Sequence, residues 1–285
     1  MMAHADEVAR GDRFEFGTNW ARFLGVLDDL RIAEAVRSLQ DMLNCERLDG
    51  LTFLDAGSGS GLFSLAAHQL GATVHSFDFD PKSVVCTGEI KKRFASGAAA
   101  WRVEEGSVLD ASYLAGLDTF DIVYSWGVLH HTGSMWQALE NVIRRVAPGG
   151  RLFIAIYNDQ GWRSRWWHFG KRMYNKRPLL RPVLLLCTLV LTRTGSVVRD
   201  TLRGNPFKTW NAHGKLRGMS AWHDAKDWIG GYPFEVAKPE EIFDFYRERR
   251  FRLERLVTCG GGLGCNQYLF IREAGPIPTG KATPE

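Results

Sequence analysis

The sequence lacks a hydrophobic run long enough to cross a membrane. Its longest strongly apolar stretch without a charge, Pro182 to Thr192, has 11 residues, whereas a spanning helix needs about 20. The first residues also lack the apolar core of a signal peptide. Cysteine is scarce, because the 285 residues include five, odd in number and scattered, which is typical of reduced thiols rather than of a disulfide framework. These absences predict a cytoplasmic protein.

The composition is that of a globular protein with one unusual segment. The chain is 45% hydrophobic and 24% charged, which excludes a disordered or collagen-like chain. Its net charge is +4, but the segment from Gly161 to Arg217 holds 13 Lys or Arg residues and one acid, Asp200. That segment carries the basic character of the chain, and the remainder is net acidic.

Short apolar strands alternate with helices from residue 51 to residue 158, a rhythm that predicts parallel βαβ units. The Ala147-Pro148-Gly149-Gly150 sequence is expected to end the last of these helices. A further helix over 239–249 precedes two strands joined by a short link, which implies an antiparallel pair. The expected strands cover 51–57, 72–78, 101–103, 119–126, 151–158, 251–258 and 266–273.

These patterns divide the chain into one α/β core with two additions. The core covers 51–158 and 239–275, and residues 1–50 form a helical N-terminal segment over the expected ligand site. Residues 159–238 are a basic and aromatic insertion, expected to form a cap over the acceptor site, and 276–285 are a flexible tail.

A glycine-rich turn follows the first expected strand, in Leu54-Asp55-Ala56-Gly57-Ser58-Gly59-Ser60-Gly61. Glycines let the backbone turn tightly and approach a ligand, and the start of the next helix offers free N–H groups. Such a turn alone also fits an ordinary strand-to-helix connection. The spacing G-x-G-x-G differs from the G-x-G-x-x-G of dinucleotide folds, and Asp78 ends the second strand where a carboxylate could accept hydrogen bonds from ribose hydroxyls.

With Asp121 opening the fourth strand in DIVYSWGVLHH, the sequence resembles the class I S-adenosylmethionine-dependent methyltransferases, most strongly those of ubiquinone and menaquinone biosynthesis. The resemblance implies a Rossmann-like, seven-stranded, mostly parallel sheet of order 3-2-1-4-5-7-6. Strand seven is antiparallel in that fold, and helices cover both faces. It also implies S-adenosylmethionine as cofactor and S-adenosylhomocysteine as product.

The resemblance further implies roles for matching positions. Asp55 and the backbone of Gly57, Ser58, Gly59 and Gly61 would hold the aminocarboxypropyl part of the cofactor. Asp78 would bind the ribose and Phe79 would lie against the adenine. The remaining expected cofactor contacts are Ser107, Val108, Ser125 and Trp126. Many relatives carry Asp where Ser107 stands.

Methyl transfer to a hydroxyl requires alignment of the nucleophile and removal of its proton. Candidate bases are His130 and His131 after the fourth strand, and His223 beside Asp224 in the insertion. Each histidine also fits a purely structural role. Tyr157-Asn158-Asp159 and the glycine-rich 260–264 segment could shape the acceptor pocket or only form turns.

Some chemistries have no support in the sequence. The fourth strand runs into Gly127-Val128-Leu129 rather than the Asn/Asp-Pro-Pro-aromatic motif of enzymes that methylate exocyclic base amines. A Pro-Cys nucleophile, expected for C5 methylation of pyrimidines, is missing. His, Cys and acidic residues are not grouped at metal-ligand spacing, so no metal is expected.

The residue pattern of the insertion indicates the chemical class of the acceptor, and it leaves alternative functions open. Trp162, Trp166, Phe169 and Met173 fall at helical spacing, with basic residues on another face. This pattern fits a cap with its apolar side on the core, or a cap that also touches an anionic membrane surface. Both interpretations favour O-methylation of a hydrophobic or amphiphilic small molecule, quinol-type or lipid-like. An RNA methyltransferase docking through this insertion, or a non-catalytic S-adenosylmethionine-binding protein, are the alternatives.

Overall fold

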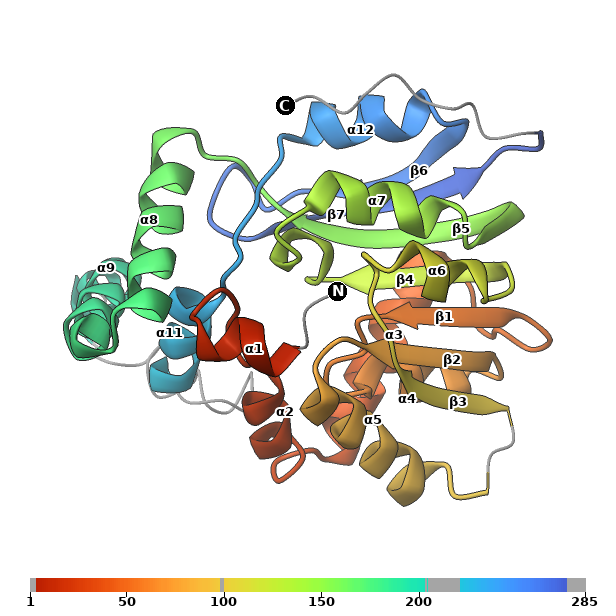
Figure 1. Cartoon of the computed structure of the whole chain (residues 1–285), viewed down its shortest axis with the longest axis horizontal. Coiled ribbons are helices and arrows are strands. Elements are labelled where there is room, and N and C mark those ends of the chain that lie inside the picture. Colours follow the sequence, from red (N-terminus) through yellow and green to blue (C-terminus); the bar gives the residue numbers. More distant parts are fainter. Residues whose placement is uncertain (1–3, 98–99, 203, 205–220, 276–285) are drawn as a thin grey trace.

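The fold is built on one seven-stranded sheet (Figure 1). The computed structural model describes residues 4–97, 100–202, 204 and 221–275. The strand order is β3-β2-β1-β4-β5-β7-β6, so the expected topology is confirmed. The strands are β1 (Thr52–Ala56), β2 (Thr73–Asp78), β3 (Trp101–Glu105), β4 (Phe120–Trp126), β5 (Val146–Tyr157), β6 (Phe251–Val257) and β7 (Cys265–Arg272).

The directions of the strands decide at which edge of the sheet their carboxyl ends lie. The first five strands pair in parallel, while β7 runs antiparallel to both β5 and β6. The carboxyl ends of the parallel strands therefore meet at one edge of the sheet. In open α/β folds, this is the edge at which ligands bind.

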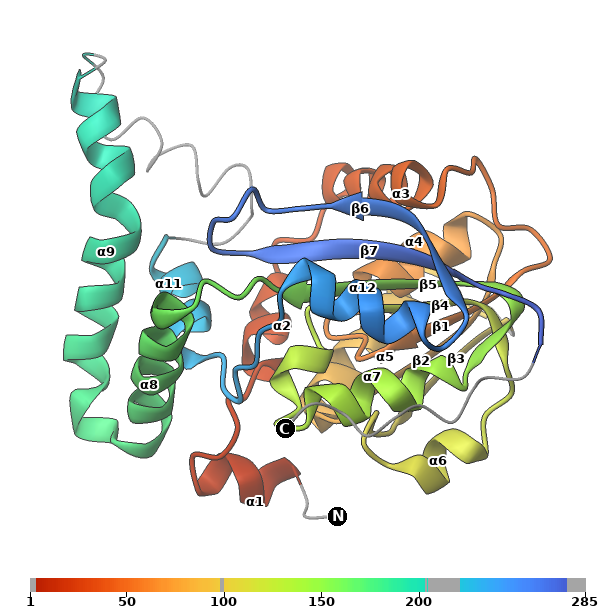
Figure 2. The same ribbon diagram turned by 90° about the horizontal axis from the view of Figure 1, so that it is seen from above.

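Helices cover both faces of the sheet because its strands alternate their side chains between two apolar layers (Figure 2). Phe53 packs in the cluster of one face, and its neighbour Leu54 packs in the cluster of the other. The first face is covered by α3 (Asp29–Leu43), α4 (Leu62–Gln69) and α5 (Pro81–Phe94), and the second by α6 (Ala111–Ala115), α7 (Met135–Ile143) and α12 (Pro239–Arg247).

One predicted boundary is wrong. The 147–150 sequence does not end a helix, because α7 already ends at Ile143 and β5 begins at Val146. Val146 pairs with Phe120 across the sheet, and the register then shifts before Ile122 pairs with Arg151. Pro and Gly therefore lie in a strand irregularity, where a missing N–H and a positive φ are tolerated.

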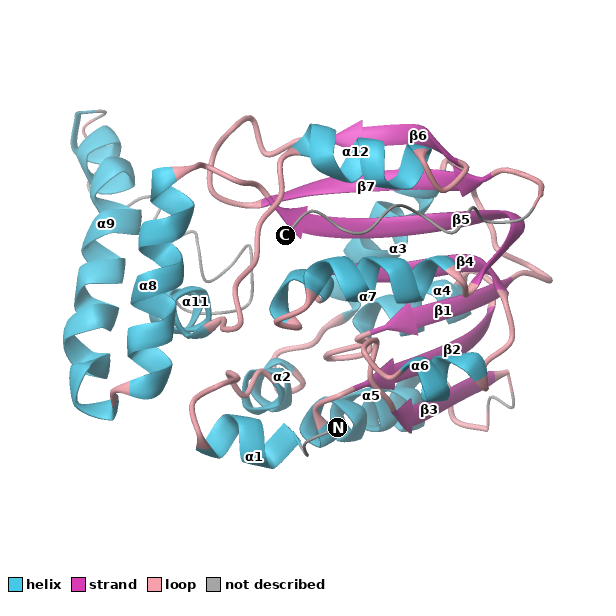
Figure 3. Ribbon diagram, turned by 45° about the horizontal axis from the view of Figure 1, so that its top comes forward, coloured by secondary structure: helices cyan, strands magenta, loops and turns pink. Residues whose placement is uncertain are grey.

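Two additions lie near the carboxyl edge of the parallel strands (Figure 3). The N-terminal segment forms α1 (His4–Ala9) and α2 (Gly17–Phe23). The insertion forms α8 (Trp162–Lys176), the 3₁₀ turn η2 (Pro178–Leu180), α9 (Arg181–Leu202) and α11 (Ala221–Gly230). Residues 203 and 205–220 of the insertion, and the tail 276–285, lie outside the described residues.

The insertion has its own small core, but α8 faces it with an unexpected side. Trp167 and Tyr174 are buried there with Leu185 of α9 and Ile229 of α11. The aromatic stripe predicted to lie on the core instead faces outward, since Trp162 and Phe169 are exposed. The aromatic residues of α8 lie on both sides of the helix, so spacing alone could not tell which side is buried. Within the described residues, no helix is both long and apolar enough to cross a membrane.

The core packing leads to a test that uses two leucines of the same helix. Leu39 is fully buried in α3, whereas Leu30 is 75% exposed. We expect Leu39→Ala to lower the free energy of unfolding by about 2–5 kcal/mol, because it leaves a cavity against the sheet. Leu30→Ala is the control and should change it by less than about 0.5 kcal/mol. Urea denaturation measures both, and equal effects would show that α3 is not packed as described.

Candidate active site

Glycine geometry and backbone hydrogen bonds fix the conformation of the glycine-rich turn after β1. Gly57 has a φ of 89°, and a Cβ added to it would lie 2.4 Å from Cγ1 of Val128. Only glycine meets both conditions without strain. The backbone N–H groups of Gly57 and Ser58 donate to Phe77 O at 2.9 and 3.0 Å, which holds the turn against the end of β2.

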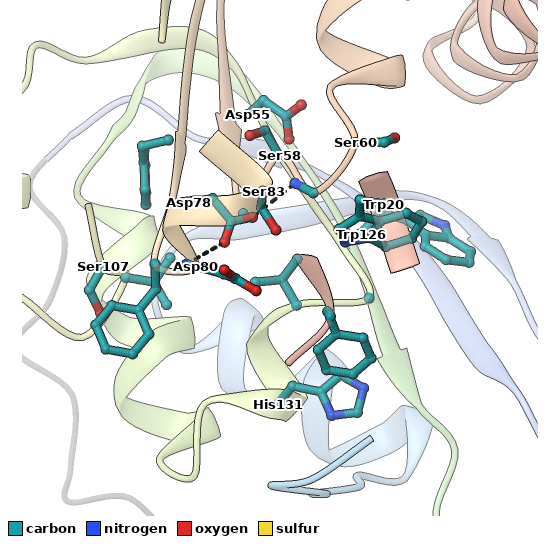
Figure 4. Close-up of a pocket in the computed structure, with 18 of the residues that line it drawn as sticks. Trp20, Asp55, Ser58, Ser60, Asp78, Asp80, Ser83, Ser107, Trp126 and His131 are labelled. Carbon is teal, nitrogen blue, oxygen red and sulfur yellow. Dashed lines mark hydrogen bonds between the residues drawn. The ribbon is translucent and has the colours of Figure 1, made fainter. Parts of the chain in front are cut away.

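Asp78 ends β2 and joins three segments. Its Oδ2 accepts the N–H of Gly59 at 2.8 Å, and its Oδ1 accepts the N–H of Asp80 at 2.8 Å (Figure 4). Each carboxylate oxygen has a further lone pair for a ligand. Burial raises the pKa of Asp78 to about 6, although these two backbone hydrogen bonds oppose the shift.

Asp55 lies deeper, at the end of β1. Its side chain accepts a hydrogen bond from the hydroxyl of Ser64, and only 2% of the residue is exposed. Burial, together with the negative charge of Asp78, raises the pKa of Asp55 to about 7. Among the described residues, no ion pair with a basic side chain compensates this carboxylate. A cationic ligand would stabilise the ionised forms of both aspartates.

These groups line one cavity of about 360 Å³. Figure 4 shows Asp55, Asp78 and Ser107 along it, and Trp20 and Trp126 also belong to its lining. Nine aromatic rings contribute to its lining. Of the residues expected from the sequence, those that line it are Asp55, Gly57, Ser58, Gly59, Asp78, Phe79, Ser107, Val108, Trp126 and His131.

The other expected site residues lie outside this lining. Gly61 begins α4 with a φ of 85°, and Ser125 donates its hydroxyl to Ala56 O at 2.7 Å. His130 is fully buried, and its ring lies tilted against the ring of Tyr157 with centroids 4.0 Å apart. Burial holds its pKa well below the usual range. The side chain of His223 lies outside the described residues.

His131 is the expected base candidate that does line the cavity. Its Nδ1 lies 2.6 Å from Pro233 O. Because a carbonyl oxygen only accepts, Nδ1 carries the proton and Nε2 keeps its lone pair. Burial lowers the pKa of His131 to about 3, so the imidazole is neutral at physiological pH and can accept a hydrogen bond.

The N-terminal segment supplies residues that the sequence did not reveal as site residues. The N–H of Gly17 donates to Oδ2 of Asp80 at 2.7 Å. Arg13 donates to His131 O at 2.9 Å and lies over the ring of Phe79 at 5.0 Å. Their signal was weak, because an arginine or a glycine far from the core motifs carries no spacing pattern.

The insertion and the N-terminal segment contact each other, although no described residue of the insertion lines the cavity. Phe14 N–H donates to Tyr232 O at 2.8 Å, and Asn19 donates to Asp227. Both segments lie near the carboxyl edge of the parallel strands (Figure 3).

Comparison with known proteins agrees with this geometry. The sequence profile of the "Methyltransferase domain" family matches residues 54–152. A ubiquinone biosynthesis O-methyltransferase of Methylocella silvestris is 30% identical over 231 residues, which cover 70% of this chain and 87% of the relative. The enzyme of the same description from Rhizobium johnstonii is 28% identical over 184 residues, or 60% of this chain and 71% of the relative.

The chain belongs to the class I S-adenosylmethionine-dependent methyltransferases.

Solved structures support the fold of this methyltransferase. The magnesium protoporphyrin IX methyltransferase of Synechocystis PCC 6803, solved with bound S-adenosylhomocysteine, is 14% identical with a TM-score of 0.52, covering 90% of this chain and 95% of that one. An O-methyltransferase family protein from Burkholderia thailandensis is 16% identical with a TM-score of 0.51, covering 95% and 67%.

The cavity of the methyltransferase fits its cofactor chemically. S-adenosylmethionine carries a sulfonium and an ammonium group, and two carboxylates with raised pKa values face this cavity. The positive-φ turn lets the backbone come close to the ligand. In the described part of the chain, no group of three or more His, Cys, Asp or Glu residues could hold a metal ion.

The raised pKa values predict that cofactor affinity depends on pH. Asp55 and Asp78 have pKa values of about 7 and about 6, and the cation favours their ionised forms. Affinity should therefore level off only above about pH 8 and fall as the pH decreases through these values, by up to about tenfold per pH unit for each group that must lose a proton. Calorimetry across this range measures it, with Asp55→Asn expected to remove the component near pH 7. Affinity that stays flat down to pH 5 would contradict the assignment.

Proposed function

We propose that the methyltransferase transfers a methyl group to a hydroxyl of a lipophilic, quinol-type small molecule. The observation that carries this proposal is a neutral imidazole, His131, in the same cavity as the two carboxylates and nine aromatic rings. The relatives named above, described as ubiquinone biosynthesis O-methyltransferases, support an aromatic hydroxyl as acceptor.

The expected cofactor residues divide into two groups in this proposal. When bound, S-adenosylmethionine supplies a methyl group on a positively charged sulfur, activated for displacement. Asp55 and the turn from Gly57 hold the aminocarboxypropyl part, and Asp78 accepts hydrogen bonds from the ribose. Phe79, Ser107 and Val108 contact the adenine, and Trp126 contributes to the lining of the same cavity. Gly61 and Ser125 position the turn from behind, because the Gly61 N–H donates to Ser58 O and the Ser125 hydroxyl donates to Ala56 O.

His131 is the proposed base. Its Nδ1–H is fixed by Pro233 O, so Nε2 is the atom that accepts the hydroxyl proton as the oxygen bonds to the methyl carbon. Because burial lowers the pKa of His131, the imidazole is uncharged at physiological pH and has a lone pair for this proton. His130 is a positioning residue in this scheme, because it accepts the N–H of Tyr157 at 3.4 Å and packs against His131.

The aromatic lining selects the acceptor. Phe16 packs on His131 with ring centroids 5.0 Å apart, and Trp20 and Trp126 line the same cavity. Flat rings of this kind stack on an aromatic substrate and exclude water from it. A quinol-type ring would thereby be held with one hydroxyl at the imidazole.

We also propose that the enzyme works in the cytoplasm. All five cysteines are free thiols in the structure, which suits a reducing compartment. A lipophilic acceptor made inside the cell would then be reached at the inner face of a membrane.

The ribose assignment is tested by Asp78→Ala. Loss of the charge-assisted hydrogen bonds, worth about 1.5–3 kcal/mol, should weaken S-adenosylmethionine binding by about tenfold or more. Asp41→Ala, which removes an exposed carboxylate of α3, is the matched control and should bind as the unaltered protein does. Equal affinities of the two variants in calorimetry would place the ribose elsewhere.

The acceptor class is tested by labelling. Enzyme, deuterium-methyl S-adenosylmethionine and a whole-cell extract are incubated, and the label is traced by mass spectrometry in lipid, aqueous and RNA fractions. We expect a methyl ether in the lipid fraction. Label confined to RNA or to water-soluble products would contradict the proposal.

His131→Ala serves as the catalytic control in the same assay. We expect the rate of labelling to fall by about 100-fold, the usual contribution of a general base, while cofactor affinity is kept. Added imidazole should restore part of the rate if Nε2 takes the proton. A variant with full activity would remove His131 from the mechanism.

A further inference from the structure

The insertion exposes an unusual amount of apolar surface. Of the 17 large hydrophobic residues that are exposed in the described structure, nine lie between residues 162 and 191, on α8, η2 and α9. We call their exposed side chains the outer face of the cap. Leu179 is 94% exposed, and Trp162 and Phe169 are exposed by more than half. Exposed apolar patches of this kind mark interaction sites.

The outer face is separate from the side of α9 that packs in the core of the insertion. On α9, Leu185 and Thr188 are buried against the cap, while Val183, Leu186 and Val190 face outward at spacings of three and four residues. The helix is therefore apolar on both sides. A helix that is apolar all round is expected to be buried, so the outward stripe lacks a partner within the described chain.

The charges around the outer face indicate the occupant. From residue 161 to residue 192 the sequence has no Asp or Glu. Arg163, Arg165, Arg172, Arg177 and Arg181 are exposed beside the apolar side chains. Arginines flanking Leu, Val and Trp match a surface with anionic headgroups and an apolar interior. RNA would satisfy the arginines but not the Leu and Val side chains, and a second copy would bring like charges together.

The position of the outer face suits such a surface. Figures 2 and 3 show α9 on the outside of the molecule, next to α8 and away from the sheet. The cap lies at the same end of the molecule as the carboxyl edge of the parallel strands, where the cavity is found. A surface that contacted α9 would therefore adjoin the acceptor end of the enzyme.

We propose that the outer face of the cap docks the enzyme onto an anionic lipid surface, with α8 and α9 lying in the interface rather than crossing it. The proposed function gives this docking its purpose, because a lipophilic acceptor resides in the membrane. The docking itself requires neither cofactor nor acceptor. It can therefore be tested separately from methyl transfer.

Vesicle co-sedimentation tests the proposal with two matched double variants. Val183→Ser/Leu186→Ser alters the outer face, and the control Val85→Ser/Leu30→Ser alters a Val and a Leu of similar exposure on α5 and α3. On vesicles of phosphatidylcholine with about one third phosphatidylglycerol, the unaltered protein and the control should bind. The affinity of the outer-face variant for these vesicles should be at least about tenfold lower, because binding scales with buried apolar area.

A charge variant keeps the test independent of any loss of packing in α9. Arg165→Gln/Arg172→Gln should weaken binding to the same anionic vesicles, and the unaltered protein should bind pure phosphatidylcholine poorly. The docking surface is supported if the outer-face variant and the arginine variant both lose vesicle binding while their affinity for S-adenosylmethionine is unchanged.

Three results would overturn the proposal. They are no vesicle binding by the unaltered protein, equal binding by the outer-face variant and the control, or a stable dimer or RNA complex that the outer-face substitutions disrupt while vesicles are ignored. Vesicle binding without methylation of any lipid would refute the proposed function and leave the docking surface standing. Methylation of a detergent-solubilised acceptor without vesicle binding would refute the docking surface and leave the proposed function standing.

Discussion

A chain of carboxylate hydrogen bonds holds the cofactor end of this enzyme together. Asp78 accepts the N–H of Gly59 from the glycine-rich turn and the N–H of Asp80 from the start of α5. Asp80 in turn accepts the N–H of Gly17 from the N-terminal segment. Three segments that are distant in sequence thereby depend on two buried or partly buried acids. Because buried charge is costly without a partner, the same arrangement favours a cationic ligand.

Aromatic contacts join the insertion to the carboxyl end of β5, beside the cofactor cavity. Lys171 of α8 is fully buried, with its Nζ 4.3 Å from the ring centre of Trp228 and 4.7 Å from that of Phe234. Burial lowers its pKa to about 7. Tyr157, at the end of β5, lies between this cluster and the histidines. The orientation of His131 therefore depends on the packing of the insertion, which also carries the outer face.

The strand order that the family resemblance implied is confirmed by the structure. The alternation of strands and helices could be read from local patterns, and so could the position of Asp55 and Asp78 at strand ends that a parallel sheet brings to one edge. The roles of these residues toward the cofactor stay a prediction. The side of α8 that is buried could not be predicted, since Trp occurs on both sides of the helix. Arg13 and Gly17 were also missed, because their contacts span more than sixty residues of sequence. The start of β5 was misplaced because Pro and Gly are usual at helix ends.

The central claim is that the turn after β1 and the carboxylate at the end of β2 bind the methyl donor. A crystal structure of the complex with S-adenosylhomocysteine tests it most directly. We expect both ribose hydroxyls within hydrogen-bond distance of the Asp78 carboxylate and the adenine beside Phe79. A nucleoside bound in another cavity, or an Asp78 that contacts only protein atoms in the complex, would contradict it.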